Sequence, residues 1–264
     1  MGKVGGAVSA VLAPAKLTVT LRVTGVRPDG YHELDAEVVT VSLADELVFD
    51  EGEAGLVVVA AEPGSRAGNL PAPPDNLVVR ALEACGRTAA VRLTKRIPVG
   101  GGLGGGSADA AAVLRWAGCA DLFVAAGLGS DVPFCLDGGR ARVQGAGERV
   151  TPLPFEARDY LLLLPPFGVD TAQVYRAWDE DPGDAAPNAL ATAALAVEPR
   201  LARWRDALGD LAGSEPALAG SGSTWFVEGG PAVAGTPSRT ELRVGAETAR
   251  LVRAHTVPAG WEGD

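Results

Sequence analysis

The sequence predicts an α+β fold in two parts, and three observations lead to that prediction. The first third of the chain alternates branched and polar residues with the period of β-strands. Six glycines occupy the seven positions from Gly100 to Gly106, between a strand-like and a helix-like segment. From about residue 171 to 212 helical patterns dominate. Strands followed by helices without a regular βαβ repeat indicate α+β, and we expect two domains, residues 1–154 and 155–264.

The strands of the first part are predicted from period-two alternation. They are residues 17–23, 36–43, 46–52, 55–61 and 90–97.

Helix boundaries come from capping residues. A Pro/Gly-rich stretch precedes a helix that is expected to run from an N-cap at Asp75 to a stop at Gly86. Ser107 is expected to open an alanine-rich helix that continues to about Trp116. Further on, "DYLLLLPP" predicts a buried strand, whereas residues 234–255 indicate only a weak helix followed by a strand.

Composition limits the function classes. A chain of 264 residues that is 47% hydrophobic can build a proper core. The net charge of −10, with no Lys/Arg cluster, argues against nucleic acid and anionic membranes as partners, so we expect a small molecule or another protein as the partner. No apolar run reaches the roughly 18 residues of a membrane span. We expect a cytoplasmic protein, a monomer or a weak homodimer.

The cysteines give no metal or disulfide pattern. Cys85, Cys119 and Cys135 form no CxxC pair, and the chain has two histidines, so neither structural zinc nor a disulfide framework is indicated. We expect small buried side chains in a reducing compartment. The sequence assigns no metal ligands.

The glycine run is typical of a phosphate site. A strand, a loop without side chains and a helix N-terminus together direct several N–H groups at one point. A flexible loop is the alternative. A Walker A loop is excluded because Gly106 stands where its lysine belongs, and no ordinary βαβ unit supports a dinucleotide fingerprint. A phosphate bound here needs a cation from elsewhere, and Lys16, at the start of strand 17–23, is a candidate.

Three segments together resemble the GHMP family of small-molecule kinases. They are "PAKLTVTLRVTGVRPDGYHELDAEVVTVSLADEL", "KRIPVGGGLGGGSADAA" and "LGSDVPFCLDGGRARVQGAGE", and "LAGSGSTWFV" resembles the family's third motif. The matches are in order and span about residues 14 to 227. The resemblance implies a two-domain GHMP kinase fold with the active-site cleft between the domains. It also implies ATP as co-substrate, with Mg²⁺.

The resemblance assigns roles at the reacting centre. Asp131, in "GSDVPF", aligns with the family's catalytic aspartate and Lys16, in "PAK", with its partner lysine. An alcohol attacking a γ-phosphoryl group needs an acceptor for its proton and cations near the transferring oxygens. The positions expected to bind the nucleotide are Gly100, Gly101, Gly102, Leu103, Gly104, Gly105, Gly106, Ser107 and Asn76.

The "PDGYHEL" segment narrows the resemblance to the branch whose alcohol substrate is a methylerythritol linked to cytidine diphosphate. The base is expected to lie against Tyr31 and His32, with Tyr175 closing its other face. The remaining positions expected near the substrate are Thr18, Thr171, Gly220, Ser221 and Gly222.

Two departures from the family pattern leave alternatives open. Thr18 stands where the family usually has asparagine, and the segment between Asp109 and Asp131 is shorter than in the family. The chain could therefore be a GHMP kinase for another alcohol, or a non-catalytic descendant that binds a nucleotide or metabolite. Retention of Lys16 and Asp131 favours a kinase.

Overall fold

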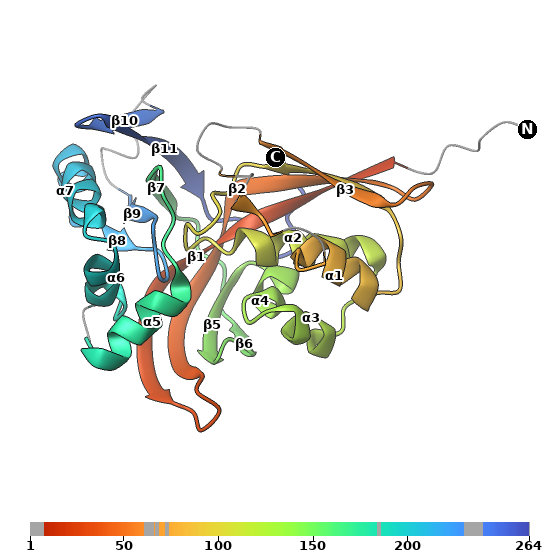
Figure 1. Cartoon of the computed structure of the whole chain (residues 1–264), viewed down its shortest axis with the longest axis horizontal. Coiled ribbons are helices and arrows are strands. Elements are labelled where there is room, and N and C mark those ends of the chain that lie inside the picture. Colours follow the sequence, from red (N-terminus) through yellow and green to blue (C-terminus); the bar gives the residue numbers. More distant parts are fainter. Residues whose placement is uncertain are drawn as a thin grey trace, which may run out of the picture.

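A computed structural model describes residues 8–60, 66, 69–71, 74–183, 186–229 and 240–263. Within these residues the strands form two sheets, one of six strands and one of five. Figure 1 shows helices α1–α4 gathered beside the first sheet and α5–α7 beside the second. No described helix is long and apolar enough to cross a bilayer.

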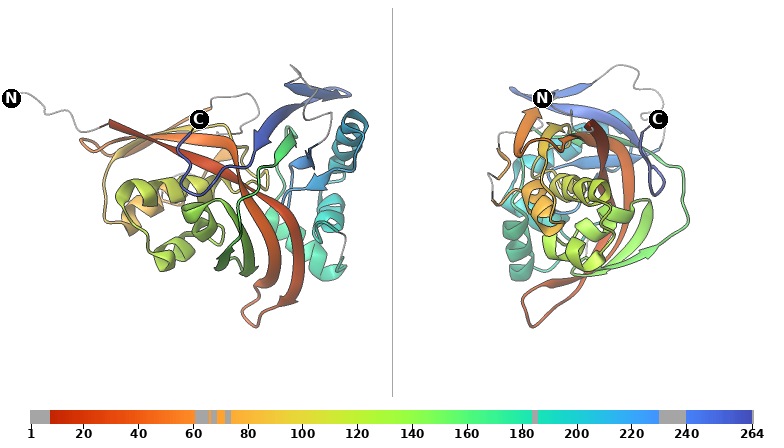
Figure 2. Two further views of the ribbon diagram at one scale, coloured as in Figure 1. Left: turned by 180° about the vertical axis from the view of Figure 1, so that it is seen from behind. Right: turned by 90° about the vertical axis from the view of Figure 1, so that its right-hand side faces the viewer.

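The first sheet is built on one long hairpin. Strand β1 (Val8–Val26) pairs antiparallel with β2 (His32–Asp50), and the two ribbons curve together in both views of Figure 2. The sheet order is β3-β4-β2-β5-β6, with β1 paired to β2. Its other strands are β3 (Gly55–Ala60), β4 (Ala90–Lys95), β5 (Arg140–Gly145) and β6 (Arg149–Pro152). The two strands predicted at 36–43 and 46–52 are therefore one continuous strand.

Among the described residues, four helices belong to this half. Helix α1 (Leu77–Ala84) connects β3 to β4, which pair in parallel, so one βαβ unit is present. The others are α2 (Gly105–Ala117), α3 (Leu122–Leu128) and α4 (Val132–Asp137). Helix α2 is buried along most of its length, because its alanines allow close approach to its neighbours.

The second sheet has the order β10-β11-β7-β9-β8. Its central strand β7 (Asp159–Leu164) carries the leucine run and is buried, as predicted. The other elements of this half are α5 (Thr171–Glu180), α6 (Ala191–Val197), α7 (Arg200–Ala212), β8 (Ala217–Leu218), β9 (Trp225–Glu228), β10 (Glu241–Val244) and β11 (Glu247–His255).

The two sheets share a hydrophobic cluster. It contains Leu17 and Val41 from the β1–β2 hairpin together with Tyr160 and Leu162 from β7. Backbone hydrogen bonds cross in the same region, where Val257 N–H donates to the Thr40 carbonyl at 3.0 Å. The α+β class is as predicted, and the boundary between residues 154 and 155 stays a prediction.

Three local predictions are wrong. Asp75 does not cap α1, because Asn76 Oδ1 accepts from the Val78 N–H at 2.9 Å and occupies that position. Helix α2 begins at Gly105, two residues before Ser107, since the left-handed Gly104 stands at the N-cap. The helix predicted within 234–255 is replaced by the hairpin of β10 and β11, and residues 234–239 lie outside the described part.

Candidate active site

The glycine loop forms one wall of a cavity of about 360 Å³ between the two halves. All eight positions from Gly100 to Ser107 line it. A Cβ on Gly102 would lie 2.1 Å from the Ala219 carbonyl oxygen, and a Cβ on Gly104 would lie 2.7 Å from Lys16 Cγ. Both residues have positive φ, +77° and +65°, so the conformation and the packing each require glycine.

The carbonyl side of the loop is tied to the second half of the chain. Gly100 O accepts from Val169 N–H at 3.1 Å, and Gly101 O accepts from Thr224 N–H at 3.1 Å. With these carbonyls engaged, the loop leads into α2, whose first-turn N–H groups have no intrahelical acceptor. The helix dipole adds partial positive charge there, so the wall suits an anion.

Lys16 is aimed into the cavity by irregular pairing in β1. The register of β1 against β2 shifts between Pro14 and Lys16 and again between Thr18 and Thr20, and such bulges re-aim side chains. The Lys16 ammonium donates to Thr18 Oγ1 at 3.1 Å. Thr18 is buried beneath Lys16 and does not line the cavity. Thr18 therefore positions the lysine rather than contacting the cavity.

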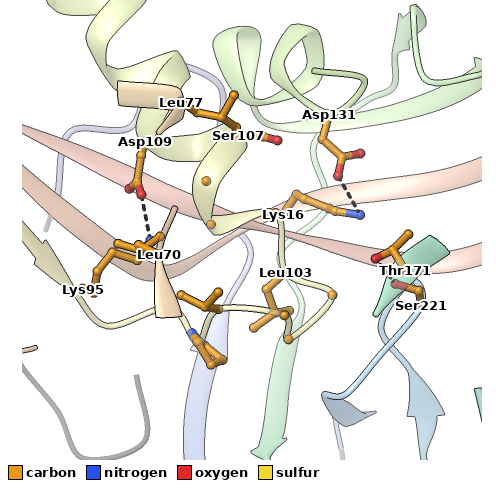
Figure 3. Close-up of a pocket in the computed structure, with 18 of the residues that line it drawn as sticks. Lys16, Leu70, Leu77, Lys95, Leu103, Ser107, Asp109, Asp131, Thr171 and Ser221 are labelled. Atoms are coloured by element: carbon orange, nitrogen blue, oxygen red, sulfur yellow. Dashed lines mark hydrogen bonds and ion pairs between the residues drawn. The ribbon is translucent and has the colours of Figure 1, made fainter. Parts of the chain in front are cut away.

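Asp131 faces Lys16 across the cavity. Asp131 Oδ2 lies 3.4 Å from Lys16 Nζ, and Figure 3 shows the two side chains pointing toward one another. Asp131 occupies the N-cap position of α4, but its side chain makes no capping hydrogen bond. The carboxylate is therefore available to the cavity, 41% exposed against 11% for the Lys16 side chain.

The opposite rim comes from the second half. Thr171 Oγ1 and Ser221 Oγ lie 2.8 Å apart, side by side in Figure 3, and both line the cavity. Gly220 and Gly222 flank Ser221 with positive φ, and neither lines the cavity. These two glycines shape the turn that presents Ser221.

Asn76 lines the cavity, and both polar atoms of its side chain are hydrogen-bonded within the protein. Its Oδ1 caps α1, and its Nδ2 donates to the Pro71 carbonyl at 3.2 Å. With Leu70, Pro71 and Leu77 it forms the less polar end of the cavity. Its amide thus holds the shape of that end.

The predicted base site is partly assembled. His32 and Tyr175 contact each other, with ring centroids 4.5 Å apart and ring planes tilted by 32°, and His32 Nε2 lies 2.7 Å from Asp179 Oδ1. Tyr175 lines the cavity, and burial raises the pKa of its hydroxyl. Tyr31 lies at the hairpin turn, 62% exposed, and the structure does not bring it into the cavity.

A buried charge cluster beneath the glycine loop was missed from the sequence. Lys95 Nζ donates to Asp109 Oδ2 at 2.8 Å and to Asp45 Oδ2, and Asp45 Oδ1 accepts from the Ile97 N–H at 2.9 Å. Burial raises the pKa of Asp109 to about 7, against the opposing charge of Lys95. Figure 3 shows the contact between Lys95 and Asp109, and both residues line the cavity. The alternation of β4 was a usable signal, because it places Lys95 on the same face as buried Val91 and Leu93.

Asp179 was also missed. It follows Thr171 and Tyr175 at intervals of four residues in α5, so all three lie on one helix face.

The cavity fits a nucleotide phosphate and offers Mg²⁺ few protein ligands. The described residues contain no group of three or more His, Cys, Asp or Glu side chains that could hold a metal. Mg²⁺ commonly keeps several waters and is bound through substrate phosphates. Among the oxygen-bearing side chains that line the cavity, Ser107 ends the glycine loop and Asp131 stands at the N-cap of α4, and both suit such an ion.

Comparisons with known proteins agree with this geometry. Residues 76–139, which include the glycine loop and Asp131, match the GHMP kinases N terminal domain. The chain is 40% identical over 243 aligned positions to 4-diphosphocytidyl-2-C-methyl-D-erythritol kinase of Ruegeria pomeroyi, covering 81% of this chain and 86% of the relative. The same kinase of Pelotomaculum thermopropionicum is also 40% identical, with 81% and 87% covered.

Solved structures give the same result. A crystal structure of 4-(cytidine 5'-diphospho)-2C-methyl-D-erythritol kinase matches with a TM-score of 0.69 at 34% identity, covering 92% of this chain and 99% of that one. A homoserine kinase from Cytophaga hutchinsonii, at 15% identity and a TM-score of 0.57, shares the fold.

Fold, glycine loop and comparisons together define a GHMP kinase, a small-molecule kinase. Within that class, the chain belongs to the family of 4-diphosphocytidyl-2-C-methyl-D-erythritol kinases.

Proposed function

We propose that this chain transfers the γ-phosphoryl group of ATP to the 2-hydroxyl of 4-diphosphocytidyl-2-C-methyl-D-erythritol, in the non-mevalonate pathway to isoprenoid precursors. The observation that carries the proposal is the Lys16–Asp131 ion pair, 3.4 Å long, inside the cavity walled by the glycine loop. An acceptor for the alcohol proton and a cation for the transferring oxygens thus meet at one anion-binding wall.

Asp131 accepts the proton of the attacking hydroxyl in this proposal. Its carboxylate is free of the capping bond that an N-cap aspartate ordinarily makes. Lys16 pairs with that carboxylate and neutralises charge that develops on the phosphoryl oxygens. Thr18 keeps the ammonium in place, because its hydroxyl oxygen accepts a hydrogen bond from Lys16. The amide oxygen of the asparagine that is usual in the family can accept such a bond in the same way.

The nucleotide occupies the wall formed by the glycine loop and α2. Backbone N–H groups of the loop and the first turn of α2 bind the phosphates, and Leu70, Pro71 and Leu77 receive the base at the apolar end. Mg²⁺ supplies charge neutralisation between the phosphates when bound, with Ser107 as a nearby oxygen.

The cytidine group of the substrate lies at the rim formed by His32 and Tyr175, whereas Tyr31 stays exposed at the hairpin turn and is not part of that rim. An aromatic face and a nitrogen-bearing edge are what a nucleobase requires. Thr171 and Ser221, bonded to each other at 2.8 Å, contribute hydroxyls between this rim and the phosphoryl site.

Release of ADP tests the proposal, with Mg²⁺-ATP and the cytidine-bearing alcohol as substrates. Asp131→Asn lowers kcat by about 10²–10⁴-fold because the proton acceptor is lost. Lys16→Met lowers it comparably. An exposed control, Asp210→Asn on α7, leaves kcat unchanged.

The same assay separates the alternatives. Turnover of 2-C-methyl-D-erythritol 4-phosphate at the same kcat/KM would point to a kinase for another alcohol. ATP binding with no turnover of any alcohol would indicate a non-catalytic descendant. Variants at Asp131 and Lys16 that keep kcat within a few-fold of the parent would contradict the assigned roles.

A further inference from the structure

Asn188 is a buried polar side chain that the proposed mechanism leaves unused. It is 3% exposed and lies between α5 and α6. Its Nδ2 donates to the Leu218 carbonyl at 2.8 Å and to the Gly220 carbonyl at 2.7 Å, while its Oδ1 accepts from the Leu190 N–H at 2.9 Å. Both amide hydrogens are therefore bound by one short segment, 30 and 32 residues further along the chain.

That segment, residues 218–224, carries Ser221 to the rim of the cavity, and we call it the serine turn. Gly222 N–H donates to the Ala219 carbonyl at 2.9 Å. Gly220 and Gly222 both have positive φ, +56° and +89°. Glycines supply these conformations but no side chain to pack, so contacts from outside the turn fix its position.

The serine turn supports the glycine loop. The N–H groups of Ser223 and Thr224 donate to two carbonyls of the loop, at 3.3 and 3.1 Å. A Cβ on Gly102 would lie 2.1 Å from the Ala219 carbonyl oxygen and 2.9 Å from that of Gly222. Because no side chain separates the two backbones, a shift of the serine turn would move the wall that is proposed to bind the phosphates.

Asn188 also lies against the strand that carries Lys16. The Leu21 carbonyl of β1 accepts from the N–H that follows Asn188, and the Leu21 N–H donates to the carbonyl that precedes it, both at 2.9 Å. The serine turn reaches the same strand, since a Cβ on Gly220 would lie 3.6 Å from Lys16 Nζ. Asn188 therefore joins β1 to the turn that supports the phosphate wall.

A local role at the start of α6 accounts for one of the three hydrogen bonds. The bond from Leu190 N–H to Oδ1 spans two residues and is the turn that asparagine commonly forms. The two Nδ2 bonds go to the distant serine turn. Asparagine is the short polar side chain that combines an acceptor with two donor hydrogens, so neither a hydroxyl nor a carboxylate can replace it here.

We propose that Asn188 is a positioning residue of the active site, whose amide holds the serine turn between β1 and the glycine loop and so keeps the phosphate wall and Ser221 correctly placed relative to Lys16. This inference rests on the proposed function. Without the amide, two buried carbonyls lose their donors, and the turn moves toward water or another donor. A displacement of about 1 Å in a catalytic site can lower the rate by about 100-fold.

Variants at Asn188 test the proposal through nucleotide affinity as well as turnover. Asn188→Asp has nearly the same shape and keeps the acceptor for Leu190, but it loses both donors, whereas Asn188→Ala loses all three bonds. Titration calorimetry with a non-hydrolysable ATP analogue and Mg²⁺ should show affinity weakened by about 3- to 10-fold. The kcat for the cytidine-bearing alcohol should fall by about 10- to 100-fold, whereas its KM should stay within about two-fold, because His32 and Tyr175 lie on other elements.

Thr256→Val is the matched structural control. The Thr256 hydroxyl donates to the Glu156 carbonyl at 2.7 Å and accepts from the Arg158 N–H at 2.9 Å, and Thr256 does not line the cavity. This variant should lower the melting temperature as the Asn188 variants do, while ATP affinity and kcat stay unchanged. Asn188 variants that lose stability but keep ATP affinity and kcat within about two-fold of the parent would overturn the proposal, since Asn188 would then serve folding alone.

Hydrogen exchange of the unmodified protein gives a second measurement, which does not require a variant to fold. The ATP analogue with Mg²⁺ should slow exchange in residues 187–191 and 218–224, because Asn188 joins both segments to the phosphate wall, and should leave β10 and β11 unchanged. Unaltered exchange in residues 187–191 would overturn the proposal. A parent protein that binds the analogue but releases no ADP with the cytidine-bearing alcohol would contradict the proposed function instead, and the ATP affinity of the Asn188 variants would still decide the role of Asn188.

Discussion

The contact between His32 and Asp179 sets which edge of the imidazole faces the proposed substrate. Asp179 Oδ1 lies 2.7 Å from His32 Nε2, and a carboxylate can only accept, so the proton resides on Nε2. A neutral ring then carries its lone pair on Nδ1, where it can accept from an amine such as that of cytosine. In the proposed function, Asp179 thereby positions His32 for recognition of the base.

We predict that Asp179→Asn raises KM for the cytidine-bearing alcohol by about 3- to 10-fold, because an asparagine amide no longer fixes the tautomer. The KM for ATP should stay unchanged, since Asp179 lies outside the glycine-loop wall. Steady-state kinetics in both substrates give the measurement. The matched control is Glu180→Gln, which removes the same charge from the adjacent exposed position. Equal increases of both KM values would show a general disturbance of α5 instead.

Asp109 makes stability depend on pH in an unusual direction. Burial raises its pKa from 3.8 to about 7 in the folded protein. Between these values the folded state binds more protons than the unfolded state, so the free energy of unfolding falls as pH rises through this window and levels off above it.

We predict that the free energy of unfolding of the parent protein decreases relative to Asp109→Asn between about pH 4 and pH 7, because asparagine does not titrate. Urea unfolding at a series of pH values measures the difference. Asp75→Asn, at an exposed position near the same cavity, serves as control and should follow the parent curve. A pH-independent difference would mean that Lys95 keeps Asp109 ionised throughout the range.

At the scale of elements, two positions of the glycine loop differ in the space that they leave for a side chain. A Cβ on Gly102 would collide with a backbone carbonyl at 2.1 Å at a φ of +77°. A Cβ on Gly106 would meet only Leu77 Cδ1, at 3.5 Å, an ordinary contact.

We predict that Gly102→Ala lowers the free energy of unfolding by about 2–4 kcal/mol, combining left-handed strain with displacement of the loop from Ala219. Gly106→Ala should lower the free energy of unfolding by no more than about 0.5 kcal/mol, because Gly106 is helical and alanine is the better helix former. Chemical denaturation measures both. Equal losses for the two variants would contradict the assignment of strain to Gly102.

The elements also show which features the sequence can and cannot predict. Strands β4 and β7 follow from local alternation, and the glycine content predicts a loop that leads into a helix, but the start of that helix at Gly105 instead of Ser107 was not predicted. The choice of Asn76 over Asp75 as cap was not predictable, because it depends on the Pro71 carbonyl that also binds Asn76. The meeting of Lys16 with Asp131 needed the family resemblance, since the two residues belong to distant segments.

At the scale of the whole molecule, the two sheets are not independent in their packing. The shared cluster draws Leu17 and Val41 from the hairpin and Leu162 from β7. The carbonyls of Gly100 and Gly101 find their hydrogen-bond donors in the second half. The predicted boundary between residues 154 and 155 therefore separates the strands of the first sheet from those of the second. The contacts between the sheets favour unfolding in one cooperative transition.

We predict that Leu162→Ala, which empties a fully buried site in β7, lowers the free energy of unfolding by about 2–5 kcal/mol in a single transition. Hydrogen exchange measured by mass spectrometry should then show reduced protection in β4 of the first sheet as well as in β9 of the second. The spread of the effect follows from the shared cluster, because destabilising one sheet removes packing partners from the other. Loss of protection confined to β7–β11 would instead mean that the two halves unfold as separate domains and that the cavity between them can open without either half losing its fold.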